Sequence, residues 1–191
     1  MDRLEPRASN PAHAIGGGSS ETLMVGWGTC ALGAVFVAQG PRGLRTILLG
    51  DDPDALLCDG RSRFPEARLE SGGLETVLSE VLTFIDDPRR ELGLALDPRG
   101  TDFQLRVWRE LGQIPFGETT SYQALASRLG RPTAFRAVAQ ACGANPLAVA
   151  IPCHRVLKSD GGLSGYRWGL ERKRALLDRE QGSIGALRLG I

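Results

Sequence analysis

The sequence predicts an α/β (α+β) N-terminal domain with a small β-sheet, followed by a mainly α-helical C-terminal domain that contains a helix-turn-helix. Apolar, β-rich runs separated by Gly and Pro lie before residue 50 and predict strands. From about residue 101 to residue 180, apolar residues recur at helical spacing between polar loops. The chain has 191 residues, which is enough for one large domain or two small ones with a buried core.

Composition divides the chain into four segments. Residues 1–20 are rich in Pro, Gly, Ser and Ala, so we expect a disordered leader. We expect the N-terminal domain over residues 21–97 and the C-terminal domain over residues 98–181, with a tail at residues 182–191. The boundary carries the turn sequence Asp-Pro-Arg-Gly at residues 97–100.

Three β-rich runs open the N-terminal domain, and a turn signal at Gln39–Gly43 separates the second from the third. The runs are Thr22–Trp27, Ala31–Ala38 and Leu44–Leu49. Residues 51–70 are polar and loop-rich, with room for one helix. Apolar residues then recur at helical spacing from Leu74 to Ile85 and predict a helix, and the alternation over residues 92–97 predicts a short strand.

Capping signals predict the helices of the C-terminal domain. Thr101, with Gln104 three residues later, forms a capping box at the start of a helix. Ser121 is expected to cap a second helix, and Thr133 a third, which runs over Ala134–Cys142. The last two helices are joined by a tight turn that contains glycine, which is typical of a helix-turn-helix.

The third predicted helix has the composition of a helix that approaches DNA. It is rich in alanine, and small residues let a helix lie close to a duplex, while Arg136 supplies one long cation. The alternative is a helical hairpin in an ordinary core. The charge distribution favours DNA, because residues 1–100 are acidic overall and residues 101–191 are basic, although the net charge is only +1.

Other classes of protein fit the composition poorly. No window approaches the ~20 apolar residues of a membrane helix, and the N-terminus lacks the apolar stretch of a signal peptide, so we expect a cytoplasmic protein without membrane contact. The four cysteines are scattered without a Cys-x-x-Cys pair. This spacing indicates neither a disulfide framework nor a zinc site, and we expect no metal.

One of these cysteines, Cys153, stands beside His154 in the run Pro-Cys-His-Arg. The thiolate is the nucleophilic form of cysteine, and a nearby imidazole is a common way to generate it at neutral pH. The pair is therefore a candidate nucleophile with its base. On these residues alone, a cysteine packed in the core is the more frequent case.

Taken together, the segments resemble the O6-alkylguanine-DNA alkyltransferases, and most of all the C-terminal alkyltransferase half of Ada-type proteins. The resemblance covers about residues 101–180, and the N-terminal domain fits more loosely through Leu48–Asp52. The matching pieces occur in order: Thr101-Asp102-Phe103-Gln104, Trp108, Ile114-Pro115-Phe116-Gly117-Glu118-Thr119, Ser121-Tyr122, Arg136-Ala137-Val138, Asn145-Pro146, Ile151–Val156, Gly161-Gly162-Leu163-Ser164-Gly165-Tyr166 and Lys173.

The resemblance implies a ribonuclease H-like N-terminal domain and a single-use repair reaction. An alkyl group would move irreversibly from O6 of guanine, and from O4 of thymine, to Cys153, with no cofactor. His154 would act as the base through a water molecule, Glu180 would fix its tautomer, and Asn145 would brace the active-site turn. The implied partner is double-stranded DNA that contains alkylated guanine, bound by a monomer through the minor groove with the damaged base flipped out.

The resemblance also assigns residues to DNA and to the base. Arg136 would fill the space that the flipped base leaves, and Tyr122 would push on the target phosphate. Further expected DNA contacts are Ser121, Thr133 and Ala134. Tyr166 would donate a hydrogen bond to the guanine, beside Val156 and Ser164, while the bulk of Arg167 and Trp168 would narrow the pocket and favour methyl over large aryl adducts.

Three other functions remain open at this stage. A cysteine hydrolase could use the same residues, although adjacent residues rarely present both side chains to one carbonyl. A damage-sensing relative without repair activity would lack the cysteine, and Cys153 is present. The third alternative is transcriptional regulation, because Ada-type proteins can carry an added regulatory module. Residues 1–20 are too short for such a module, so on this alternative the sequence would be a fragment of an Ada-type regulator.

Overall fold

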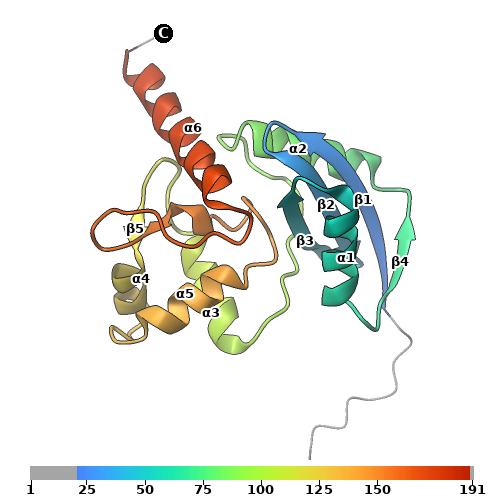
Figure 1. The fold of residues 1–191 in the computed structure, drawn as a ribbon, viewed down its shortest axis with the longest axis horizontal. Helices are drawn as coiled ribbons and strands as arrows, with labels where there is room; N and C mark the ends of the chain where they lie inside the picture. The colour runs from blue at the N-terminus through green and yellow to red at the C-terminus, as the bar shows by residue number, and fades with distance from the viewer. Residues whose placement is uncertain (1–20, 190–191) are drawn as a thin grey trace, which may run out of the picture.

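The computed structural model describes residues 21–189, so the expected leader at residues 1–20 lies outside the described residues. Figure 1 shows a sheet-containing N-terminal half beside a helical C-terminal half, with the last helix projecting away from the body. The predicted fold class, a small N-terminal sheet followed by mainly helical structure, is confirmed.

A mixed sheet forms the centre of the N-terminal half. Its strands are β1 (Thr22–Cys30), β2 (Gly33–Gly40), β3 (Gly43–Gly50) and β4 (Arg68–Ser71). The first three are antiparallel, β4 runs parallel to β1, and the spatial order is β3-β2-β1-β4. The three predicted strands and the turn between the second and third are correct. The short, polar β4 was not predicted.

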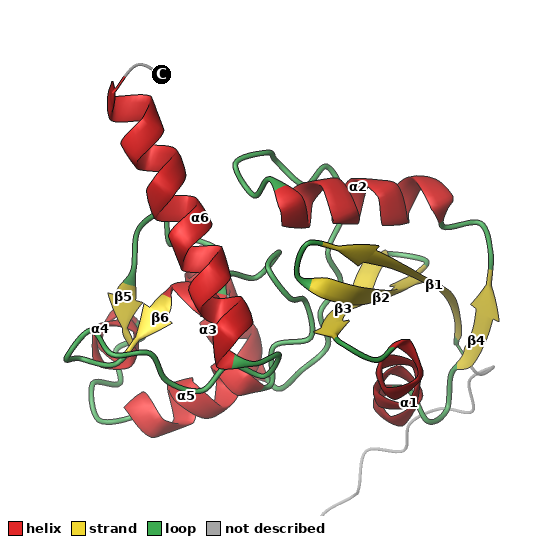
Figure 2. Cartoon of the chain, turned by 45° about the horizontal axis from the view of Figure 1, so that its top comes forward, coloured by secondary structure: helices red, strands yellow, loops and turns green. Residues whose placement is uncertain are grey.

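Two helices cover opposite faces of the sheet, as Figure 2 shows. They are α1 (Pro53–Arg63), inside the segment where one helix was expected, and α2 (Glu75–Asp86), which confirms the helix predicted from Leu74 to Ile85. Successive residues of β2 pack on opposite faces of the sheet, because side chains alternate along a strand. Val35 and Val37 join the main core with α2, whereas Phe36 packs in the smaller cluster with α1.

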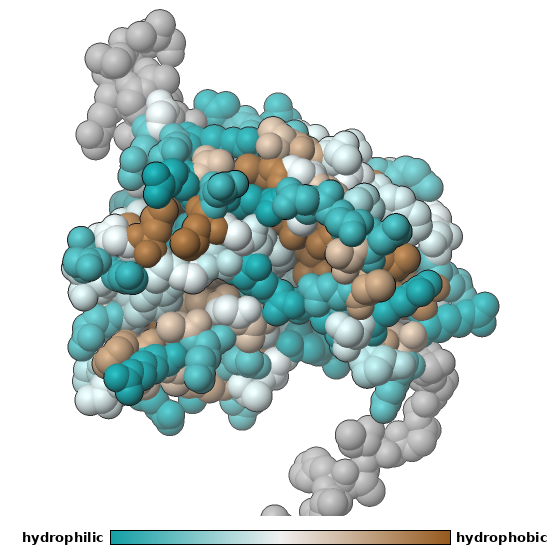
Figure 3. Space-filling view, viewed as in Figure 1, coloured by the Kyte–Doolittle hydropathy of each residue, from teal (hydrophilic) through white to brown (hydrophobic). Residues whose placement is uncertain are grey.

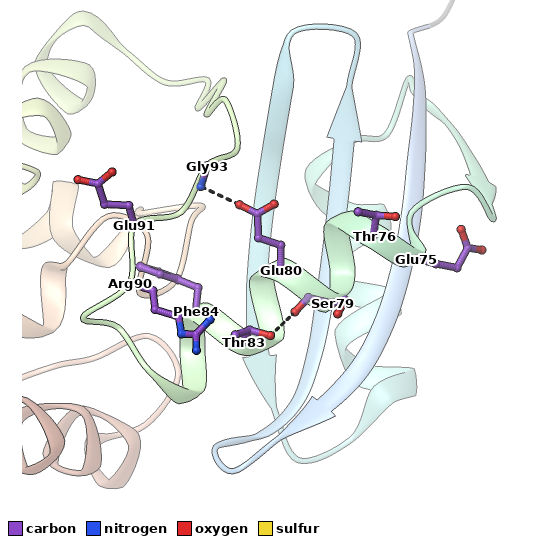
Figure 4. Close-up of a pocket in the computed structure, with 9 residues that line it drawn as sticks. All are labelled: Glu75, Thr76, Ser79, Glu80, Thr83, Phe84, Arg90, Glu91 and Gly93. Carbon is purple, nitrogen blue, oxygen red and sulfur yellow. Dashed lines mark hydrogen bonds between the residues drawn. The ribbon is translucent and has the colours of Figure 1, made fainter.

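The predicted strand at residues 92–97 is wrong. Only Leu96 forms an isolated bridge, with Leu44 of β3, and its side chain is 39% exposed. Leu92 and Leu94 are partly buried against the main core, so the alternation reflects burial without the pairing of a strand. The loop is fixed locally instead, because Glu80 of α2 accepts a hydrogen bond from the Gly93 amide at 2.7 Å (Figure 4).

Three helices pack together in the C-terminal half: α3 (Asp102–Leu111), α4 (Tyr122–Arg128) and α5 (Phe135–Gly143). The capping box of α3 is present, and the Ser121 hydroxyl accepts from the Ala124 amide at 3.0 Å, so both predicted caps are correct. The cap predicted at Thr133 is wrong, because Ala134 occupies the N-cap position and no side chain caps α5. Gly130 turns the chain between α4 and α5 with φ 70°, a conformation that favours glycine.

The remaining elements are short or terminal. Strands β5 (Thr120–Ser121) and β6 (Val156–Leu157) pair in parallel, the 3-10 helix η1 (Cys153–Arg155) precedes β6, and α6 (Leu170–Leu189) ends the described chain. Strands of two residues leave no periodic pattern, so β5 and β6 were not predicted. Helix α6 continues through most of the segment expected as a tail.

The surface shows no extended apolar area on the face seen in Figure 3, where apolar residues form separate patches among hydrophilic ones. Large apolar side chains that are exposed lie on different elements: Trp27, Leu96, Phe135 and Leu170. Within the described residues, no helix has the length and apolar character needed to cross a membrane.

Candidate active site

Cys153 lies at the start of η1, where its side chain is only 4% exposed. The chain reaches it through a buried turn after α5, in which Val149 has φ 64°. A β-branched residue in this left-handed region is strained by about 1–3 kcal/mol and persists only where neighbouring contacts hold it. The strain marks this turn as a place where backbone shape matters.

Asn145 holds the turn and the thiol together. Its Nδ2 donates to the Ile151 carbonyl at 2.8 Å and to Cys153 Sγ at 3.2 Å, while its Oδ1 accepts from the Leu147 amide at 2.9 Å. The side chain is fully buried, so these bonds satisfy most of its capacity. Asn145 thus connects the backbone of the turn to the sulfur of Cys153.

Glu180 of α6 reaches the imidazole of His154, which the sequence alone could not demonstrate. His154 Nε2 and Glu180 Oε1 lie 2.8 Å apart, and both side chains are buried. The Arg155 guanidinium also donates to both oxygens of Glu180 and to the Ile114 carbonyl. The Gly117 amide donates to Glu180 Oε2 at 3.1 Å, so the carboxylate is hydrogen-bonded on every side.

The surroundings of Glu180 and His154 determine which of the two side chains is charged. Burial alone would raise the pKa of Glu180, but hydrogen bonds from His154 and Arg155 outweigh it and hold this pKa at about 2. Burial lowers the pKa of His154 below its usual value, and Glu180 opposes this only in part. A neutral His154 donates from Nε2 to the carboxylate, which leaves Nδ1 as an acceptor. Nδ1 has no hydrogen-bond partner among the described residues.

The thiol of Cys153 needs a base. Burial raises its pKa to about 11, although the Asn145 hydrogen bond and the nearby Lys173 ammonium favour the thiolate. The resting group is therefore a thiol at neutral pH. Nucleophilic chemistry at this sulfur requires proton removal during the reaction, and the unpaired nitrogen of His154 on the next residue is the candidate acceptor.

Lys173 belongs to the site, although the sequence did not assign it a role. Its fully buried Nζ donates to the carbonyl oxygens of Val156 at 2.6 Å and Ser164 at 3.0 Å. It also lies 6.0 Å from the centre of the Tyr122 ring. Lys173 thereby ties β6 to the loop before α6. The available signal was its spacing, since Lys173 precedes Leu176 and Leu177 by three and four positions and so falls on the apolar face of the helix.

Two aromatic side chains enclose the site from the loop before α6. The Tyr166 ring stands edge-on to His154, with centroids 6.5 Å apart, and Trp168 stands edge-on to Tyr166 at 5.1 Å. Neither Tyr166 Oη nor Trp168 Nε1 has a hydrogen-bond partner in the part of the chain that the structure describes. Burial raises the pKa of Tyr166 well above its usual value, so the hydroxyl is a neutral donor.

Arg167 does not join Tyr166 and Trp168 in the aromatic group beside His154. Its guanidinium is turned toward the N-terminal half and forms an ion pair with Asp59 of α1 at 3.0 Å. The expectation that Arg167 and Trp168 both narrow the pocket therefore has geometric support from buried Trp168 alone. Arg167 instead links the loop to α1.

The residues expected to contact DNA fall into two groups. Tyr122 is half-buried, and its hydroxyl accepts a hydrogen bond from Ser164 Oγ at 3.2 Å, so it belongs to the pocket wall. Arg136 and Thr133 are exposed and Ala134 is partly exposed, at or near the start of α5. The Arg136 guanidinium lies 5.7 Å from the centre of the Phe135 ring.

A separate hollow of about 750 Å³ lies beside α2. Its lining residues include Glu75, Thr83 and Glu91, as Figure 4 shows. None of the lining residues is a cysteine or a histidine. Among the residues that the structure describes, no cluster of His, Cys, Asp and Glu is suited to hold a metal ion. The buried, hydrogen-bonded Asn, Cys, His and Glu side chains gather instead around Cys153.

The fold and the site define a class of protein: one that carries a buried thiol, Cys153, next to a buried His–Glu pair and close to a short pair of helices. Comparison with known families is specific. The family model described as "6-O-methylguanine DNA methyltransferase, DNA binding domain" matches residues 102–182. The inducible methylated-DNA–protein-cysteine methyltransferase of Bacillus subtilis is 42% identical over 123 residues, which are 63% of this chain and 69% of the relative.

The chain belongs to the methylated-DNA–protein-cysteine methyltransferase family, as the resemblance predicted. It is 47% identical over 166 residues to the bifunctional transcriptional activator and DNA repair enzyme Ada of Escherichia coli, which covers 86% of the chain and 47% of that protein. It covers 42% of the Salmonella typhimurium regulatory protein ada, so it spans less than half of these two relatives. The crystal structure of Mycobacterium tuberculosis OGT in complex with DNA matches with TM-score 0.71 at 34% identity, covering 83% of this chain and 93% of that one.

Proposed function

We propose that this protein repairs DNA by transferring the alkyl group of O6-alkylguanine, and of O4-alkylthymine, irreversibly to Cys153. The observation that carries the proposal is the buried array in which Asn145 contacts the sulfur and Glu180 contacts the histidine next to it. Membership of the methylated-DNA–protein-cysteine methyltransferase family supports the same reaction. Each chain would act once.

The steps follow from the groups present. His154 Nδ1 takes the thiol proton through a water molecule, and Glu180 stabilises the imidazolium that forms. The Cys153 thiolate attacks the alkyl carbon, a C–S bond forms, and the C–O bond breaks. The electron pair of the broken C–O bond goes to the guanine, which takes up one proton and stays in the DNA as the unmodified base. The product is a thioether, which offers no easy reverse reaction.

DNA handling is assigned to the helix pair. Chemistry on a base requires extrusion from the stack, at a cost of a few kcal/mol. The exposed Arg136 would fill the vacated space from the minor groove, supported by Ser121, Thr133 and Ala134, while Tyr122 acts on the target phosphate. Tyr166 would donate to the flipped base beside Val156 and Ser164. We propose a monomer that works in the cytoplasm without a cofactor.

Two alternatives stand beside this function, and a stoichiometry assay separates the cysteine hydrolase from the single-use reaction. The identity to the Ada proteins favours, as a second candidate, a fragment of a regulator that also activates transcription. A cysteine hydrolase would turn over repeatedly. Incubation with excess duplex that contains labelled O6-methylguanine should plateau at one methyl per chain, and Cys153→Ala should show none. Continued product formation beyond one equivalent would overturn the single-use reaction.

A further inference from the structure

The outer edge of β3 is where the N-terminal sheet meets the active-site turn. β3 is the last strand of the sheet on the side of the helical half (Figure 1). The Ile47 amide donates to the Pro146 carbonyl at 2.9 Å, and the Ala148 amide donates to the Ile47 carbonyl at 3.0 Å. Leu147 thus pairs with Ile47 in an isolated parallel bridge. The segment that follows Asn145 therefore docks on the open edge of the N-terminal sheet.

Thr46 adds a second bond at the same place. Its hydroxyl donates to the Pro146 carbonyl at 2.6 Å, and its side chain is fully buried. A carbonyl oxygen has two lone pairs, so the Thr46 hydroxyl and the Ile47 amide satisfy both. The peptide unit that joins Pro146 to Leu147 is therefore fixed by two donors from neighbouring residues of β3, and its Leu147 amide donates to Asn145 Oδ1.

This peptide unit controls the group that touches the reactive sulfur. Asn145 precedes Pro146, and its Nδ2 lies 3.2 Å from Cys153 Sγ. The strained Val149 sits between two anchors: the bond from Ala148 to Ile47 on one side and the bond from Asn145 to the Ile151 carbonyl on the other. Without the β3 anchor, the turn can relax its strain by moving, and Asn145 would move with it.

We propose that Thr46 is a positioning residue for alkyl transfer, whose hydroxyl holds the Pro146 carbonyl and through it the Asn145 amide at the sulfur of Cys153. The inference rests on the proposed function of Cys153. It gives the N-terminal sheet a part in the reaction, because a strand distant in sequence sets the geometry of the thiol. Thr46 touches neither DNA nor the reacting atoms in this account.

Two substitutions separate the hydroxyl from the shape of the side chain. Thr46→Val keeps the shape and removes the donor, while Thr46→Ser keeps the donor and removes a methyl group.

The measurement is the single-turnover rate constant of methyl transfer from O6-methylguanine duplex as a function of pH. Thr46→Val should lower the rate constant about fivefold at neutral pH, the effect of one lost hydrogen bond. Its rate profile should move to higher pH, because a displaced Asn145 stabilises the thiolate less. Thr46→Ser should match the wild type.

Val25→Ala is the matched control. Val25 is buried in the smaller cluster under α1 and lies two strands from Thr46 across the sheet, so its truncation weakens the same sheet without removing a contact to Pro146. It should lower Tm while leaving the rate constant and its pH profile unchanged. A wild-type rate and profile in Thr46→Val, or an equal change in Val25→Ala, would overturn the positioning role while wild-type transfer stands. Absence of transfer in the wild type would instead overturn the proposed function itself.

Discussion

Glu180 Oε1 lies 2.8 Å from His154 Nε2, although 26 positions separate the two residues in sequence and Glu180 belongs to a different helix. Because Nε2 donates to the carboxylate, the other ring nitrogen can accept a proton from the neighbouring thiol. The contact fixes the orientation of the imidazole, as the proposed role of His154 as the base requires. The predictions below depend on this pair and on the helices around it.

Replacing Glu180 with Gln should slow methyl transfer about a hundredfold, the scale expected when a general base loses its partner. The neutral amide cannot stabilise the imidazolium that forms as the thiol is deprotonated. DNA affinity should stay near that of the wild type, because Glu180 is buried. Single-turnover rates and duplex binding measure the two effects. Glu171→Gln, an exposed change on the same helix, is the control and should behave as wild type.

Acid should destabilise the protein through the same carboxylate. The pKa of Glu180 is about 2 in the folded chain, below its usual value of 4.5, so its contribution is complete above pH 4.5 and is lost as pH falls toward 2. This contribution is on the order of 3 kcal/mol. The pKa of His154 is also lowered by folding, because the fold favours the neutral ring. Below the usual pKa of 6.5, this histidine therefore adds a further loss of stability as the pH falls. Urea unfolding at pH 7 and pH 3 should show a smaller difference for Glu180→Gln than for wild type; equal differences would contradict this.

Arg136→Ala should impair repair of duplex DNA about tenfold but leave transfer from free O6-methylguanine unchanged. The free base needs no extrusion, so a side chain that stabilises the flipped state has nothing to contribute. Rates with the two substrates, measured side by side, give the comparison. Arg174→Ala, which removes an exposed cation from α6, is the control. Equal losses with both substrates would argue against a flipping role.

Trp168 should limit the size of the adduct. The buried indole stands against Tyr166, which stands against His154. The wild type should therefore react faster with O6-methylguanine than with O6-benzylguanine, and Trp168→Ala should raise the benzyl-to-methyl rate ratio about tenfold. Arg167→Ala should leave the ratio unchanged, because Arg167 pairs with Asp59. A wild type that accepts both adducts equally would contradict the narrow pocket.

The sequence predicted the elements that carry strong local patterns. The three β-rich runs, the stripe of α2 and the capping box of α3 each determine their own structure, because the periodicity and caps lie within the element. The wrong strand at residues 92–97 shows the limit: its leucines alternate, but only Leu96 meets the edge of β3. Likewise, Thr133 has the chemistry of a cap, yet the turn places Ala134 at the cap position.

The site was predictable to the extent that it is contiguous in sequence. Cys153 and His154 are adjacent in the sequence, so they could be named as a candidate pair without knowledge of the fold. The family resemblance added Asn145 and Glu180. The roles of Lys173 and Thr46 depend on which backbone carbonyls they meet, and those carbonyls come from distant segments. The ion pair that turns Arg167 toward α1 depends on the packing of the two halves in the same way.

Intact mass spectrometry after incubation with O6-methylguanine duplex tests the central claim most directly, because it reports the product, its stoichiometry and its site together. The account predicts a gain of one methyl group on each chain, mapped by peptide analysis to Cys153, and no gain in Cys153→Ala. An unmodified chain after the DNA has been repaired, or a methyl group on another residue, would contradict it.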